Sequence, residues 1–261
     1  MLREGKLVET VIILLFLGVA LYYLRRALRG KIQEYRRLPM LDAISEGIDR
    51  AVETGRPVFM SMGAYAYLSG LFAAMTLSAV NIMRYTYRLA VRKGATPMFM
   101  LPINPEVGPL IDGLYRESAV AEGKPQAYKR ENIYYFGNDE PAYRSGLLNL
   151  LAVQRPATYV IAGAVTGTGD MNTTVAARSV GALVVGGQAR ITHQGEVGPL
   201  SFDYYAACAD IYAAGAILSG EQVVMSSLIA ADLLTYIAIA IAIIGVVIRL
   251  AGLPFESWIK I

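Results

Sequence analysis

The sequence predicts an α/β protein: a doubly wound, mostly parallel sheet of about six strands, flanked by one N-terminal and one C-terminal transmembrane helix. Two charge-free runs near the chain ends predict the two helices. Between these runs, short apolar or β-branched segments alternate with longer helical ones, which is typical of a parallel sheet covered on both faces. The composition also favours a membrane protein, since 55% of the residues are hydrophobic, only 17% are charged, and the mean hydropathy is +0.42.

The N-terminal transmembrane helix is predicted within residues 1–27. Residues 10–24 carry no charge, and their helical length approaches the thickness of the hydrocarbon core. Two tyrosines at the end of this run fit the aromatic belt, and the two arginines after them can extend into the headgroups. These predicted interface residues are Tyr22, Tyr23, Arg25 and Arg26. A secretory signal peptide is the alternative, but no small-x-small cleavage motif follows the run.

A basic juxtamembrane linker is predicted at residues 28–40, and its charge predicts the orientation. Six Lys or Arg residues lie within residues 25–37, whereas two precede the first helix. This excess predicts a multi-pass protein of the cell membrane with two helices and a cytoplasmic central domain. The second helix gives the opposite bias, because Arg249 and Lys260 lie beyond it. Because the two helices disagree, we adopt the orientation that the first helix predicts.

The α/β domain is predicted at residues 41–222. The predicted strands are 57–62, 97–103, 132–137, 157–165, 182–187 and 203–208, and the predicted helices are 42–53, 66–92, 105–117, 141–153, 171–179 and 210–222. Residues 58–83 lack charge and offer a third membrane span as an alternative. Their internal Gly and Ser residues favour a buried strand followed by a helix. The last helix is expected to continue into the second anchor with little interruption.

The C-terminal transmembrane helix is predicted at residues 223–253, and a tail follows at 254–261. Residues 233–248 form a charge-free run of sixteen residues, which exceeds the usual length of a strand. Asp232 and Arg249 bound this run and are predicted at the membrane interfaces.

The composition excludes several kinds of chemistry. The single cysteine, Cys208, excludes an intramolecular disulfide, and we expect it to be a buried, inert thiol. The single histidine, His193, excludes His-rich metal sites. A net charge of +3 and the lack of a basic stripe with interleaved aromatics argue against nucleic acid. We predict no catalytic residue, metal or cofactor; an enzyme that uses Asp139 or Asp170 is the least favoured alternative.

Ligand-binding candidates follow the predicted strands, because open α/β sheets bind ligands at the carboxyl ends of their strands. The loop after the fourth predicted strand combines glycines with a helix N-terminus that can hold an anion. It matches neither the phosphate-loop nor the dinucleotide fingerprint, and Asp170 as an N-cap of a plain turn is the alternative. Asp139 has a similar alternative in the first turn of a helix. The candidates are Gly163, Gly167, Thr168, Gly169, Asp170, Asn104, Asp139 and Gln188.

Four segments carry a resemblance to a known family. They are LDAISEGIDRAVETGRPVFMSMG (41–63), RPATYVIAGAV (155–165), VGALVVGGQ (180–188) and FDYYAACADIYAAGAILSG (202–220). Together they resemble an uncharacterised prokaryotic family of membrane-anchored α/β proteins, described as a domain of unknown function. The resemblance covers about residues 40–220 and implies a membrane-tethered α/β domain without implying a reaction. An acidic pair of that family appears here only as Ala209 followed by Asp210.

Two functions are expected. The first is an integral membrane scaffold or assembly protein, whose cytoplasmic α/β domain self-associates in a homo-oligomer or docks other subunits of a membrane complex. The alternative is a membrane-tethered sensor domain that binds a small molecule or nucleotide, with Gly167, Thr168 and Gln188 as contacts. The lipid bilayer is the partner common to both.

Overall fold

The structure is a computed structural model, which describes residues 7–30, 37–165, 167–190, 201–220 and 222–250. The chain divides into two compact units. One unit comprises Arg36–Ser219, and the other combines Met1–Tyr35 with Gly220–Ile261. The first unit is an α/β domain, and the second contains two long helices.

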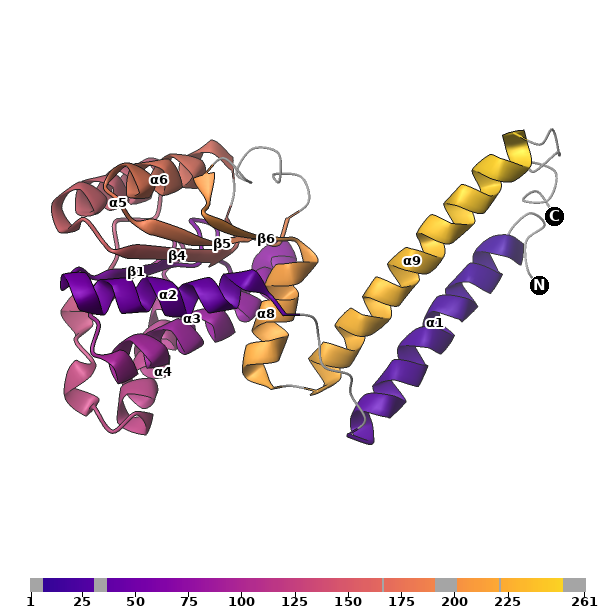
Figure 1. The fold of residues 1–261 in the computed structure, drawn as a ribbon, viewed down its shortest axis with the longest axis horizontal. Helices are drawn as coiled ribbons and strands as arrows, with labels where there is room; N and C mark the ends of the chain where they lie inside the picture. The colour runs from indigo at the N-terminus through magenta and orange to yellow at the C-terminus, as the bar shows by residue number, and fades with distance from the viewer. Residues whose placement is uncertain (1–6, 31–36, 166, 191–200, 221, 251–261) are drawn as a thin grey trace. The chain divides into compact units, whose positions relative to one another are not determined.

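The α/β domain confirms the predicted fold class, because its described residues form one six-stranded sheet with helices on both faces (Figure 1). The strands are β1 (Val58–Ser61), β2 (Pro97–Met100), β3 (Ile133–Tyr134), β4 (Thr158–Gly163), β5 (Leu183–Gln188) and β6 (Tyr204–Ala207). The helices are α2 (Pro39–Thr54), α3 (Ala73–Lys93), α4 (Val107–Ala121), α5 (Glu140–Gln154), α6 (Gly167–Ser179) and α8 (Ala209–Ser219). Short 3₁₀ helices are η1 (Gly70–Phe72), η2 (Pro125–Ala127) and η3 (Arg130–Asn132).

The strand order places a reversal of the chain path in the middle of the sheet. The order is β3-β2-β1-β4-β5-β6, and every neighbouring pair is parallel. The chain starts at β1, builds outward to β3, and then crosses back to β4. Val58 of β1 therefore lies opposite both Pro97 and Thr158. The chain continues from β1 into α3 on one face of the sheet and from β4 into α6 on the other (Figure 1), and sheets of this kind bind ligands at such a point.

The central strands are buried because helices cover both of their faces. Every residue of β1, β4 and β5 is buried, as expected for mainly apolar strands in a parallel sheet. Helices α5 and α6 lie on one face, and α2, α3, α4 and α8 lie on the other (Figure 1). Under α5, the side chains of Phe59 and Tyr159 pack with Leu147 and Leu151 in one hydrophobic core.

The uncharged stretch 58–83 forms strand β1 and most of helix α3, so the predicted strand followed by a helix is confirmed. Helix α3 packs closely on the sheet at the end of β4. Gly163 has a φ of 116°, and a Cβ there would lie 2.6 Å from the Cβ of Ala79. Glycine is therefore required at this position for α3 to pack this closely against the end of β4.

The two-helix unit contains α1 (Leu7–Leu28) and α9 (Gln222–Leu250), which pack side by side (Figure 1). Both are long and apolar enough to cross a membrane. The most apolar window of α9 is 0% buried, whereas the core helix of a soluble protein would be covered. The 29 residues of α9 extend over roughly 43 Å, which exceeds the ~30 Å of a hydrocarbon core.

The predicted interface residues occupy the ends of these helices, with one exception. The rings of Tyr22 and Tyr23 meet edge to face at 5.4 Å between centroids, and the two arginines that follow lie in the last turn of α1. Arg249 lies in the last turn of α9. Asp232 lies inside α9, partly exposed, with more than two helical turns before it.

Two local expectations were wrong. The helix predicted at 210–222 does not continue into the second anchor, because Gly220 adopts a left-handed φ of 68° between Ser219 and the start of α9. Such a glycine is a common helix terminator. Cys208 is half-buried rather than fully buried, since it follows the end of β6 with a φ of 45°.

Candidate functional site

Polar side chains from four elements meet inside the domain at the carboxyl ends of β1 and β4. We call Ser61, Tyr143, Tyr159, Asp170 and Thr173 the buried polar cluster. The hydroxyls of Ser61 and Tyr143 are 2.8 Å apart, and Ser61 Oγ also accepts from the amide of Gly63 at 3.0 Å. The Tyr159 hydroxyl forms no hydrogen bond within the described residues. Buried polar atoms are normally paired, so the Tyr159 hydroxyl is an exception among the described residues.

The two tyrosines of this cluster remain neutral at physiological pH. Burial raises the pKa of Tyr143 and of Tyr159 well above the ordinary value of 10.0, and the carboxylate of Asp170 reinforces both shifts. A neutral phenol can donate and accept hydrogen bonds, but it is not a general base. These two tyrosines are thus suited to binding and orientation rather than to proton abstraction.

A second group lies nearer the surface of the same edge. We call Tyr65, Phe72, Glu140, Arg144 and Arg190 the edge cluster. Tyr65 donates a 2.6 Å hydrogen bond to Glu140, and Arg144 forms an ion pair with the same carboxylate. The ring of Tyr65 stacks on Phe72 at 6.3 Å, and the guanidinium of Arg190 lies 5.4 Å from the centroid of Phe72. A continuous set of contacts thus joins α5, the loop after β1 and the loop after β5.

The charges of the edge cluster shift the pKa values of its members. The hydrogen bond from Tyr65, followed by that from Arg144, lowers the pKa of Glu140 below its ordinary 4.5. The same hydrogen bond raises the pKa of Tyr65 to about 12, with burial as the next cause. Both groups therefore keep their hydrogen bond across the physiological pH range.

We expect Glu140→Gln to lower the free energy of unfolding by about 1 kcal/mol at pH 7, because the ion pair and its charge-assisted hydrogen bond are lost. The folded-state pKa of Glu140 is depressed, so its stabilisation is present above pH 4.5 and declines as the pH falls below that value. Urea unfolding followed by near-UV circular dichroism should show wild type and variant converging in acid. A difference that stays constant between pH 7 and pH 3 would contradict this assignment.

The first turn of α6 lies against the edge cluster. A Cβ at Gly169 would meet the carboxylate of Glu140 and would lie 2.7 Å from Nη2 of Arg144. Glycine at this position therefore lets the helix N-terminus approach the arginine. Asp170 lies within this turn, 1% exposed, with Oδ2 3.5 Å from the amide of Ala64. Its predicted role as an N-cap is wrong, because α6 already begins at Gly167.

The remaining candidates have separate local roles. Asp139 caps α5 by accepting a 2.9 Å hydrogen bond from the amide of Ala142, which confirms the alternative of an acidic helix N-terminus. Asn104 accepts from the amide of Glu106 at 3.2 Å and shapes the loop after β2. Gln188 is 0% exposed at the end of β5 and donates to the carbonyl of Arg190 at 3.0 Å. Its Oε1 has no hydrogen-bond partner in the described part of the chain.

The structure brings together only some of the predicted residues. Gly169 and Asp170 contact the clusters, whereas Asn104 and Asp139 serve their own loops. The side chain of Thr168, like His193, lies outside the described residues.

Sequence reasoning missed the aromatic members of the edge cluster and Arg144. A signal was present, because the loop after the first predicted strand reads GAYAYLSGLF and carries aromatics at a carboxyl end. Within the described ranges, no group of three or more His, Cys, Asp or Glu side chains could hold a metal ion.

Fold and site together define a class of protein, namely a parallel α/β domain joined to two helices long enough to span a membrane. The chain belongs to the family defined by a domain of unknown function (DUF6754), whose model matches residues 1–259. This match includes both apolar helices as well as the α/β domain, and it confirms the resemblance to an uncharacterised family. No curated protein and no solved structure matches the chain.

Proposed function

We propose that this protein is a membrane-anchored binding protein, whose cytoplasmic α/β domain holds a small aromatic anion of the nucleotide kind at the carboxyl edge of its sheet. The observation that carries the proposal is the edge cluster, in which aromatic rings lie beside two arginines and one of these arginines, Arg144, adjoins the first turn of α6. The strand order β3-β2-β1-β4-β5-β6 supports it, because Rossmann-like dinucleotide-binding domains have the same order and bind at the same switch point.

Each part of the edge cluster suits one part of such a ligand. The rings of Tyr65 and Phe72, with the nearby Tyr67 at 5.9 Å from Phe72, offer faces on which a planar base can stack. The guanidinium groups of Arg144 and Arg190 match the geometry of a phosphate. The first turn of α6 adds backbone N–H groups with the positive end of the helix dipole.

The buried amide of Gln188 supplies a specific polar contact beside this site. Its Oε1 is buried and lacks a partner among the described residues, and its Nε2 is already used on the carbonyl of Arg190. The free oxygen can accept a hydrogen bond from an exocyclic amine of a base. A ligand that offers this donor would satisfy the buried oxygen and so offset the cost of leaving it without a hydrogen bond.

The test is a thermal-shift screen of the detergent-solubilised full chain against nucleoside mono-, di- and triphosphates and dinucleotides. We expect at least one compound to raise the melting temperature, and Arg144→Met to weaken its binding by about 10-fold or more, because a hydrogen bond to a charged group is lost. Arg50→Met is the matched control, since Arg50 is exposed on α2 outside the cluster. A panel without any stabilising compound would refute the proposal, as would equal losses in the two variants.

Self-association as a membrane scaffold is the second candidate. Three leucines in the loop after β1 and on α3 are solvent-exposed: Leu68 at 38%, Leu71 at 82% and Leu77 at 57%. Exposed apolar patches are typical of protein interfaces, and these leucines would form part of one. A homo-oligomer that uses these leucines should dissociate in Leu71→Glu, which mass photometry of the purified chain can detect. A wild-type monomer at micromolar concentration would exclude the scaffold.

A further inference from the structure

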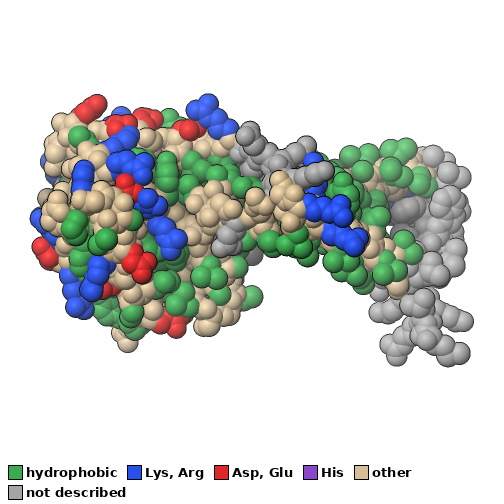
Figure 2. All heavy atoms as spheres, turned by 90° about the horizontal axis from the view of Figure 1, so that it is seen from below, with side chains coloured by type: hydrophobic (Ala, Val, Ile, Leu, Met, Phe, Trp, Pro, Cys, Tyr) green, Lys and Arg blue, Asp and Glu red, His purple; other side chains and the backbone are tan. Residues whose placement is uncertain are grey.

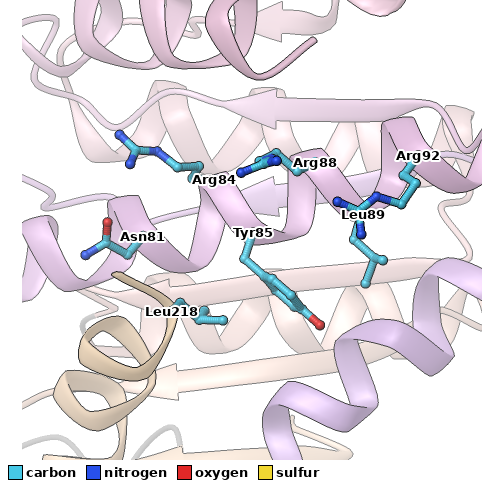
Figure 3. A pocket seen from close by; sticks show the side chains of 7 residues that line it. All are labelled: Asn81, Arg84, Tyr85, Arg88, Leu89, Arg92 and Leu218. Atoms are coloured by element: carbon cyan, nitrogen blue, oxygen red, sulfur yellow. The ribbon is translucent and has the colours of Figure 1, made fainter. Parts of the chain in front are cut away.

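A basic pocket lies between α3 and α8, on the opposite face of the sheet from α5 and α6. It encloses about 160 Å³. Its lining includes Asn81, Arg84, Tyr85, Arg88, Arg92 and Leu218 (Figure 3). The three arginines occupy successive turns of α3, because residues four apart share one face of a helix. Basic side chains gather on the domain in the view from below, with some acidic ones between them (Figure 2).

The pocket carries an excess of positive charge. Glu122 is its counter-ion and accepts from Arg88 at 2.6 Å and from Arg92 at 2.9 Å. Arg84 has no ion-pair partner in the described part of the chain. Lys124 adds a further cation at the end of α3, where its Nζ donates to the carbonyls of residues 91 and 92. Two of these four cations therefore share the carboxylate of Glu122, and the other two form no ion pair in the described residues.

Glu122 stays ionised and limits this excess under all physiological conditions. The hydrogen bonds from Arg92 and then from Arg88 lower the pKa of Glu122 to about 2. Removing its charge while keeping its shape would release both arginines for an external anion. Glu122→Gln is therefore a variant in which a pocket that binds phosphate should bind it more tightly.

The pocket is close in sequence to the second apolar helix. Leu218 lines the pocket, and α9 begins at Gln222, four residues later. Four residues reach at most roughly 14 Å, at about 3.6 Å per residue. If α9 spans the bilayer, as the proposed function holds, the pocket lies close to the headgroups of the leaflet on the domain side.

We propose that the pocket between α3 and α8 binds the phosphate of an anionic lipid headgroup in that leaflet. The guanidinium groups supply charge and paired donors for phosphate oxygens, and Leu218 with the ring of Tyr85 offers an apolar wall. Basic residues close to an anionic leaflet are attracted by ~1 kcal/mol each, which is about fivefold in binding. Bound lipid holds α3, and with it the domain, against the membrane surface.

The test uses the full chain in nanodiscs made of phosphatidylcholine, with or without phosphatidylglycerol, and measures amide hydrogen exchange in residues 81–92. We expect phosphatidylglycerol to slow this exchange about fivefold in wild type and in the control Arg50→Glu. The slowing should be lost in Arg84→Glu and enhanced in Glu122→Gln. Because Arg84 has no partner to lose, its reversal should leave the melting temperature unchanged.

Four results would overturn the inference. Equal slowing in Arg84→Glu and Arg50→Glu would show that the pocket is not the site. Slowing by 20 mM inorganic phosphate in phosphatidylcholine discs, on the order of that by phosphatidylglycerol, would assign the pocket to a free phosphate. A chain that enters the discs but shows no lipid dependence would refute the lipid site alone, whereas failure to enter the discs would refute the membrane anchoring on which it rests.

Discussion

Gly63→Ala is expected to destabilise the α/β domain by about 3 kcal/mol, which is a large part of the stability of a typical domain. Gly63 follows β1 with a φ of 85°, and a Cβ there would meet the backbone carbonyl of Ala164 and lie 2.7 Å from the amide of Val165. These two loops are also joined by a 3.0 Å hydrogen bond from Ala164 to the carbonyl of Met62. A backbone atom held in this way cannot move aside.

Gly94→Ala is the matched control for this prediction. Gly94 has a φ of 87° at the end of α3, and a Cβ there would meet nothing within 4 Å. Its substitution therefore costs only the left-handed conformation, about 1 kcal/mol. Urea unfolding by near-UV circular dichroism gives both values. Equal losses of unfolding free energy in the two variants would mean that the close approach of the β1 and β4 loops does not account for the effect of Gly63→Ala.

The double variant Ile239→Lys/Ile243→Lys is expected to abolish membrane insertion of α9. The two side chains are 50% and 58% exposed on one face of the helix, where a spanning helix contacts lipid. A lysine near the centre of a spanning helix costs about 3 kcal/mol on insertion scales. Two lysines therefore offset a large part of the free energy that the apolar side chains contribute to insertion. On the surface of a soluble protein, the same changes would alter stability by less than about 0.5 kcal/mol.

Insertion is read from a glycosylation acceptor added after Ile261 and translated with microsomes. The proposed orientation places the domain in the cytoplasm and both termini across the membrane, so the acceptor should be modified in wild type. It should remain modified in the apolar control Ile239→Leu/Ile243→Leu and should lose modification in the lysine variant. Modification of the lysine variant at the wild-type level would show that α9 does not depend on an apolar lipid-facing surface.

The elements of the fold could be predicted because burial leaves a direct mark on sequence. Strands β1 and β4 are covered on both faces, so most of their residues are apolar and they differ from the helices beside them. The order of the strands in the sheet cannot be predicted in this way, because a buried strand has a similar apolar composition whichever strand lies beside it. The break at Gly220 was visible as a glycine, but only its left-handed φ shows that the helix ends there.

The candidate site was predicted as an edge of the sheet and not as a set of contacts. The rule for parallel sheets pointed to the loops at the carboxyl edge, yet Asp139 and Asn104 use their side chains within those loops. The edge cluster joins Phe72 to Arg190 across 118 positions of sequence, a distance over which spacing carries no information. Tyr65 lies in one of the loops at that edge, but the sequence does not distinguish a tyrosine that contacts a ligand from one that packs.

Partition of the wild-type chain during membrane fractionation tests the central claim most directly. Membranes that contain the chain are washed with high salt and with alkaline carbonate, without detergent, and the supernatant and pellet are compared. The account predicts that the chain stays in the pellet and is released only by detergent, because α1 and α9 lie in the bilayer. Full-length chain in the carbonate supernatant would contradict membrane anchoring and, with it, the orientation and the lipid site.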